Sequence, residues 1–125
     1  MESHNKPIIV IFSINLVFIQ IIERIMEKAE VKHTLLVLTS FSDTKKISSH
    51  DTISLILVDD LVIGTSSLEL IYNLRLGNKI LCPIIYFGVS EHDGEKKSMS
   101  SGASHFIIKP FNPSIVLPII QNIFA

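Results

Sequence analysis

Residues 55–60 read Leu-Ile-Leu-Val-Asp-Asp, a short apolar run that ends in two carboxylates. Other runs of strand length lie on both sides of it, at residues 8–12, 34–38, 84–87 and 105–108. These runs are continuously apolar and rich in β-branched residues, and they do not alternate between apolar and polar. That pattern is typical of parallel strands whose two faces are both covered by helices. The sequence therefore predicts a buried parallel sheet.

The segments between these runs carry helical periodicity. One predicted helix follows Asn15, a suitable N-cap, and a second covers residues 67–76 and stops at Gly77. A third begins after Asn112, and Pro118 inside it is expected to kink it. Residues 41–49 and 91–101 are weaker helix formers, so the helix predicted for 41–49 is short or poorly formed.

Strand and helix alternate five times, which predicts an α/β fold: a doubly wound, five-stranded parallel sheet with helices on both faces, as in flavodoxin-like proteins. The length of 125 residues suits one domain, so residues 1–125 are expected to form a single domain.

Composition excludes several functional classes. The net charge of -1 argues against nucleic-acid binding and against a polybasic membrane anchor. The apolar run at residues 7–22 is interrupted by polar side chains and is shorter than the roughly 20 residues of a membrane-spanning helix. The single cysteine, Cys82, cannot form an internal disulfide, so a cytoplasmic location is expected.

In a doubly wound sheet, chemistry is found at the carboxyl ends of the strands. The candidate positions are therefore Phe12 with Ser13, Asp59 with Asp60, Gly88, and Lys109. No glycine-rich phosphate loop follows the first predicted strand, so a dinucleotide or P-loop site has no support in the sequence.

Taken in order along the chain, these motifs resemble the receiver domain of two-component response regulators. Residues 55–59 with Gly64 are similar to the family's aspartate-ended third strand and the glycine of the loop after it. Residues 83–85 resemble the fourth strand, and residues 102–111, Gly-Ala-Ser-His-Phe-Ile-Ile-Lys-Pro-Phe, resemble the family's fifth strand and Lys-Pro-Phe signature.

The resemblance implies roles for particular residues. Asp59 would be the phospho-accepting carboxylate, and Lys109 would pair with its phosphoryl group. The Lys109–Pro110 bond would be cis, as is common in the family. The implied partners are signalling proteins, among them a sensor histidine kinase. A partner or a weak homodimer is expected on the face of the fourth helix, fifth strand and fifth helix.

The chain departs from the family at four positions. Phe12 and Ser13 replace the acidic pair of the first strand, which leaves Asp59 as the only candidate metal ligand, so no metal or other cofactor is expected beyond weak Mg²⁺ binding. Gly88 replaces a hydroxyl residue, and Phe106 is a switch aromatic without a hydroxyl. Ser90 could replace the missing hydroxyl, and Glu91 could supply a metal ligand. Asp60 is expected to point away from Asp59 unless the strand has already ended, and to be a turn or cap residue.

These departures leave two hypotheses open. In the first, the chain is a degenerate receiver that works as a protein-interaction module with weak or no Mg²⁺-dependent phosphorylation, and Asp59 and Lys109 form a structural ion pair. In the second, Asp59 accepts a phosphoryl group from a sensor histidine kinase, and the only catalysis is the chain's own phosphorylation. A metabolic enzyme of similar topology lacks any cofactor motif.

Overall fold

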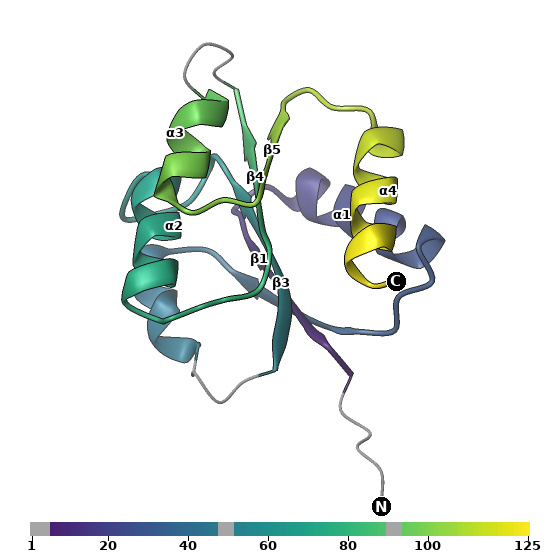
Figure 1. The fold of residues 1–125 in the computed structure, drawn as a ribbon, viewed down its shortest axis with the longest axis horizontal. Coiled ribbons are helices and arrows are strands. Elements are labelled where there is room, and N and C mark those ends of the chain that lie inside the picture. Colours follow the sequence, from purple (N-terminus) through teal and green to yellow (C-terminus); the bar gives the residue numbers. More distant parts are fainter. Residues whose placement is uncertain (1–5, 48–51, 90–93) are drawn as a thin grey trace, which may run out of the picture.

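The computed structural model describes residues 6–47, 52–89 and 94–125. Its centre is one sheet of five parallel strands in the order β2-β1-β3-β4-β5 (Figure 1). The strands are β1 (Ile8–Phe12), β2 (Thr34–Leu38), β3 (Ile53–Asp59), β4 (Ile84–Gly88) and β5 (His105–Ile108). The predicted sheet is confirmed, and this strand order places the ends of β1, β3, β4 and β5 next to one another in turn.

Helices cover both faces of the sheet. They are α1 (Leu16–Lys28), α2 (Ser67–Leu76), α3 (Gly94–Ser101) and α4 (Pro113–Ile123), and a short 3₁₀ helix, η1 (Phe41–Lys46), replaces a regular helix after β2. The Asn15 side chain caps α1 by accepting hydrogen bonds from the amides of Val17 and Phe18. Asn112 caps α4 through the amide of Ser114. These asparagines start the helices directly after the strand ends that form the candidate site.

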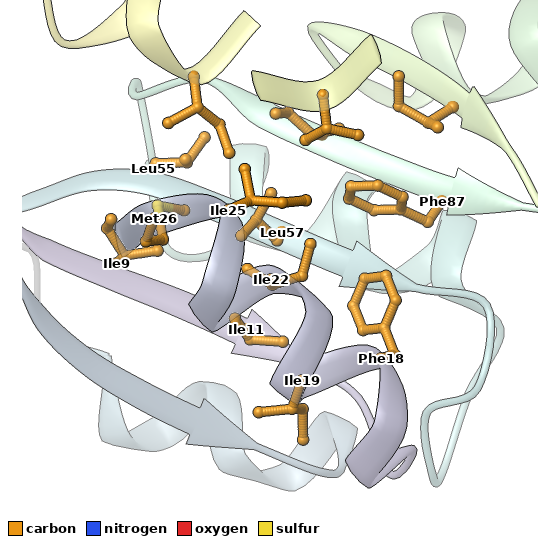
Figure 2. Packing of buried hydrophobic residues seen from close by; sticks show 14 residues of the cluster. Ile9, Ile11, Phe18, Ile19, Ile22, Ile25, Met26, Leu55, Leu57 and Phe87 are labelled. Atoms are coloured by element: carbon orange, nitrogen blue, oxygen red, sulfur yellow. The ribbon is translucent and has the colours of Figure 1, made fainter. Parts of the chain in front are cut away.

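Two apolar cores lie on opposite faces of the sheet. Helices α1 and α4 pack on one face, and helices α2 and α3 lie on the other (Figure 1). Alternation along β3 sends Leu55 and Leu57 to the α1 side, where they meet Ile22 and Phe18 (Figure 2). Ile56 and Val58 pack on the α2 side. Both faces of the central strands are therefore apolar, which explains their continuous hydrophobic pattern.

Most expected elements appear where the sequence predicts them. Strand β3 is longer than the apolar run that revealed it, because it begins at Ile53 and ends at Asp59. The short helix predicted within residues 41–49 is confirmed as η1, which covers Phe41–Lys46. The first residues of the 91–101 segment lie outside the described residues, and α3 begins at Gly94. Helix α4 is a single element with Pro118 inside it.

None of the helices in the described ranges 6–47, 52–89 and 94–125 has the length and hydropathy needed to cross a bilayer.

Candidate functional site

The candidate site lies at the carboxyl edge of the sheet, at the ends of β1, β3 and β5, with β4 between the last two. Asp59 is the last residue of β3, Ser13 directly follows β1, and Lys109 directly follows β5. The Ser13 amide is held by the carbonyl of Leu38. The Lys109 amide is held by the carbonyl of Gly88 at the end of β4. The parallel ladders therefore fix all three side chains at one edge, although they are far apart in the sequence.

Asp59 is fully buried, and both of its carboxylate oxygens accept hydrogen bonds. Oδ1 accepts from Lys109 Nζ at 2.6 Å and from the Asp60 amide at 2.9 Å. Oδ2 accepts from the Ser13 hydroxyl at 2.7 Å. A buried carboxylate is stable only when it is paired and hydrogen-bonded in this way. The expected pairing of Asp59 with Lys109 is therefore present.

Lys109 binds two carboxylates. Besides Asp59, its Nζ donates to Asp60 Oδ1 at 2.7 Å. The ammonium also lies 5.5 Å from the centre of the Phe18 ring, within cation–π range. One cation therefore serves two anions in a largely buried cluster.

The pKa values of the cluster follow from burial and pairing. Burial raises the pKa of Asp59 above its ordinary value, although hydrogen bonds from Lys109 and Ser13 oppose that shift. At Asp60, burial also favours a raised pKa, but the hydrogen bond from Lys109, the hydrogen bond with Asp59 and the charge of Lys109 together outweigh burial and lower the Asp60 pKa. Burial would lower the pKa of Lys109, and its bonds to Asp59 and Asp60 outweigh burial and raise it. The ammonium is therefore stabilised in its charged form.

Asp60 lies in the bend after β3, as expected of a turn residue, but its ion pair with Lys109 was not predicted. Strand β3 ends at Asp59, so Asp60 is free of the strand's alternation and turns back toward Lys109. Its side chain is only 19% exposed, and it is an ion-pair partner of Lys109. The sequence does show a second carboxylate directly after Asp59. Side-chain alternation in a continuing strand would have sent Asp60 to the opposite face, so its contact with Lys109 was not predicted.

Phe12 is buried in the core on the α2 side, together with Val58 and Leu70, and does not face Asp59. A Mg²⁺ ion at this edge would need free oxygen donors around Asp59. Among the described residues no group of three His, Cys, Asp or Glu side chains could hold a metal ion. Ser13 and Lys109 already bind the oxygens of Asp59. Mg²⁺ is commonly held by one or two carboxylates and several waters, and among the described residues the carboxylates at this edge, Asp59 and Asp60, are both bound to Lys109.

Tyr86 is a residue of this edge that the motif comparison missed. A Cβ on Gly88 would lie 2.7 Å from its ring and 2.9 Å from its hydroxyl oxygen, so the tyrosine fills the space that a larger residue at position 88 would need. The ring also packs against Phe106, with centroids 5.8 Å apart. Residues two apart in a strand share a face, and that rule would have paired Tyr86 with Gly88.

Of the other candidate residues, Phe106 and Cys82 make their contacts outside the Asp59 cluster. Phe106 contacts the start of α3, since a Cβ on Gly94 would lie 2.8 Å from its ring. Ser90 and Glu91 lie outside the described residues. Cys82 is half-buried at the opposite end of β4, and burial raises its pKa to about 11, consistent with an unreactive thiol.

Comparison with known structures identifies the fold as that of response-regulator receiver domains. A two-component response regulator from Clostridium difficile superimposes with a TM-score of 0.80 at 18% identity, covering 95% of this chain and 96% of that chain. The chemotaxis response regulator CheY4 of Vibrio cholerae gives 0.76 at 15% identity, covering 95% and 99%.

A third similar structure is the receiver domain of the sensor histidine kinase PA1611 from Pseudomonas aeruginosa, whose active-site cleft holds a coordinated magnesium ion. It gives a TM-score of 0.76 at 17% identity, covering 97% of this chain and 99% of that chain. The predicted α/β receiver fold is therefore confirmed.

Sequence comparison adds a similarity over part of the chain. The transcriptional regulatory protein MalR of Bacillus subtilis is 37% identical over 73 residues, which cover 58% of this chain and 31% of that protein. The match therefore spans less than a third of its length. No family model matches the chain.

Proposed function

We propose that this chain is a degenerate receiver-type signalling domain that works as a protein-interaction module, with weak or no Mg²⁺-dependent phosphorylation. The observation that carries the proposal is the state of Asp59. Its side chain is fully buried, and Ser13, Lys109 and the Asp60 amide bind its two oxygens. A carboxylate held in this way stabilises three strand ends without any chemistry.

The missing acidic pair supports the same proposal. Phosphoryl transfer depends on neutralising the charge of the phosphoryl oxygens, usually through a carboxylate-held divalent cation. Phe12 is committed to the core and Ser13 is neutral, so neither position supplies a carboxylate that would hold such a cation. The Lys109 ammonium supplies the positive charge in this cluster.

A titration tests the proposal directly. Wild-type protein is titrated with Mg²⁺, with and without beryllofluoride, while amide NMR shifts around Asp59 are followed. We expect no saturable response at millimolar Mg²⁺, and Asp59→Asn serves as the control for shifts that do not involve this carboxylate. Saturable shifts that Asp59→Asn abolishes would contradict the proposal.

The second candidate function is a competent phospho-receiver that accepts a phosphoryl group on Asp59 from a sensor histidine kinase. The contact of 2.6 Å between Asp59 and Lys109 supports it, because the residues that the family uses for the acceptor and for phosphoryl pairing are already together. A positive result in the titration favours this function.

We further propose that partners, or a second copy of the chain, bind the face formed by α3, β5 and α4. With η1 counted as the second helix, α3 and α4 are the fourth and fifth helices of the sequence prediction. Met99 of α3 and Ile115 of α4 are exposed apolar side chains there, and β5 is an edge strand of the sheet. Helix α3 consists largely of polar residues of modest helix propensity, so it reorders at low cost. Hydrogen exchange that slows in α3 on association supports this face, and protection confined to α1 would exclude it.

A further inference from the structure

The Lys109 ammonium is already paired with two anions of its own chain. An ammonium has three donors, and here two of them point to Asp59 Oδ1 at 2.6 Å and to Asp60 Oδ1 at 2.7 Å. The Lys109 side chain is only 18% exposed, so it has little opportunity to exchange either partner for water.

The two carboxylates are held differently. Asp59 is fixed from three sides, by Ser13, by Lys109 and by the Asp60 amide, and is completely buried. Asp60 lies one residue past the end of β3, on the solvent side of the cluster. Within the described residues, Lys109 is the side chain that donates a hydrogen bond to the Asp60 carboxylate. Asp60 is therefore the partner that can be exchanged.

We propose that the Asp60 carboxylate is an internal ligand of Lys109 and occupies the place where an oxyanion next to position 59 would bind the ammonium. Carboxylate and phosphate oxygens are both strong acceptors for such a charge-assisted hydrogen bond, so one can replace the other. The ligand class that Asp60 excludes is therefore a tetrahedral oxyanion. In naming that oxyanion as a phosphoryl group, the inference rests on the proposed receiver-type function.

The net charge of the cluster also disfavours the binding of a further anion. With Asp59 and Asp60 both charged, one ammonium faces two carboxylates, and a further anion meets net repulsion. Burial strengthens this repulsion, because water screens the charges less. Asp60 is thus a positioning residue that acts through Lys109. It keeps the ammonium bound to a carboxylate of the same chain.

The test uses inorganic phosphate and variants that change one charge at a time. In Asp59→Asn the buried carboxylate is removed and Asp60 still binds Lys109, so phosphate binding stays weak. In Asp59→Asn with Asp60→Asn the ammonium has lost both carboxylates, and we expect phosphate to bind about tenfold more tightly. Binding is measured by calorimetry and by NMR shifts at Lys109, without Mg²⁺.

Two control variants distinguish the effect of the Asp60–Lys109 contact from the effect of the protein's net charge. Asp59→Asn with Glu27→Gln has the same net charge as the double variant but removes an exposed carboxylate of α1, and it should bind phosphate as weakly as Asp59→Asn alone. Asp59→Asn with Asp60→Glu restores a carboxylate next to Lys109 and should restore the exclusion. Equal phosphate affinity in Asp59→Asn and in Asp59→Asn with Asp60→Asn, including no binding by either, overturns the proposal.

A second measurement covers the case in which the double variant does not fold. Asp60→Asn alone keeps the pair of Asp59 with Lys109. Phosphate should raise its Tm above the value in sodium chloride of equal ionic strength, while the wild type shows no such difference. An identical response of both proteins overturns the inference. Neither test involves Mg²⁺ or phosphoryl transfer, so a failure here is distinguishable from a failure of the proposed function.

Discussion

The Ser13 hydroxyl donates a hydrogen bond of 2.7 Å to Asp59 Oδ2. Its oxygen also accepts a hydrogen bond from the Asn15 amide at 3.0 Å, which ties the start of α1 to the same carboxylate. A neutral donor therefore occupies the contact next to Asp59. A second carboxylate there would face Asp59 directly and would need a cation between the two.

Ser13→Asp should therefore create Mg²⁺ dependence. Without a divalent cation, the new carboxylate repels Asp59, so the variant is less stable than the wild type. Mg²⁺ should relieve the repulsion and raise Tm in a saturable way, measured by thermal unfolding over a Mg²⁺ series. Ser13→Asn, which adds no charge, is the matched control and should not respond. Phe12 is a poor site for grafting an acid, because it is buried among apolar side chains. A Ser13→Asp variant whose Tm ignores Mg²⁺ would show that the two side chains cannot share a cation.

Asp59→Ala should destabilise the fold strongly. It leaves the Lys109 ammonium with Asp60 alone and the Ser13 hydroxyl without its acceptor, and breaking a buried pair costs about 3–5 kcal/mol. Asp59→Ala with Lys109→Met should recover part of that loss, because the ammonium that has lost its buried partner is removed as well. Urea unfolding of the wild type, both single variants and the double variant measures the coupling. Strict additivity would mean that the two residues do not interact.

Tyr86 should ionise above its ordinary pKa. Burial raises the pKa of its phenol, and the negative charges of Asp60 and Asp59 raise it further, because both effects disfavour the phenolate. Asp60→Asn removes one of these charges and should lower the Tyr86 pKa toward its ordinary value. The measurement is the difference between ultraviolet pH titrations of each protein and its Tyr86→Phe counterpart.

The same shift predicts the direction of the alkaline stability. The pKa is higher in the folded than in the unfolded state, so the stability it contributes is complete below the unfolded value and is lost as pH rises through the folded one. The wild type should therefore lose more stability than Tyr86→Phe over that range. An Asp60→Asn titration identical to that of the wild type would contradict the placement of the phenol beside the carboxylates.

Gly88→Ser should be destabilising because of Tyr86. The added Cβ would lie 2.7 Å from the tyrosine ring, which forces the ring to move, and overpacking of this kind costs about 1–3 kcal/mol. Tyr86→Leu in the same chain frees the space, so the double variant should be less destabilised than the sum of the two single changes. Chemical denaturation of the four proteins measures this difference. A Gly88→Ser cost that stays the same in the Tyr86→Leu background would contradict the steric explanation.

Cys82 should react slowly with thiol reagents in the folded protein. Burial raises its pKa to about 11, so little thiolate exists at neutral pH. We expect slow labelling of native protein at pH 7 and rapid labelling after denaturation, both followed by absorbance. Labelling of native protein at the rate of the unfolded chain would contradict this expectation.

Local sequence patterns were enough to predict the layers of the fold and the strand ends that carry the candidate site. Continuous apolar runs predict strands covered on both faces, and Asn15 and Asn112 mark helix starts that the structure confirms. The sheet geometry placed Asp59 and Lys109 at one edge, and the resemblance to receiver domains implied that the two form a pair. These features depend on periodicity and local hydrogen bonding, which are written in short stretches of the chain.

Only the tertiary structure decided what surrounds that pair. Asp60 joins Lys109 because β3 ends one residue earlier, and the end of a strand depends on its ladder with β4. Tyr86 fills the space beside Gly88, a contact set by side-chain packing that no motif spacing records. The burial of Phe12 against Val58 and Leu70 likewise depends on the docking of α2 onto the sheet. Local sequence fixes periodicity and strand ends to within a residue or two, while charge pairing at this edge is decided by distances that only the packed chain defines.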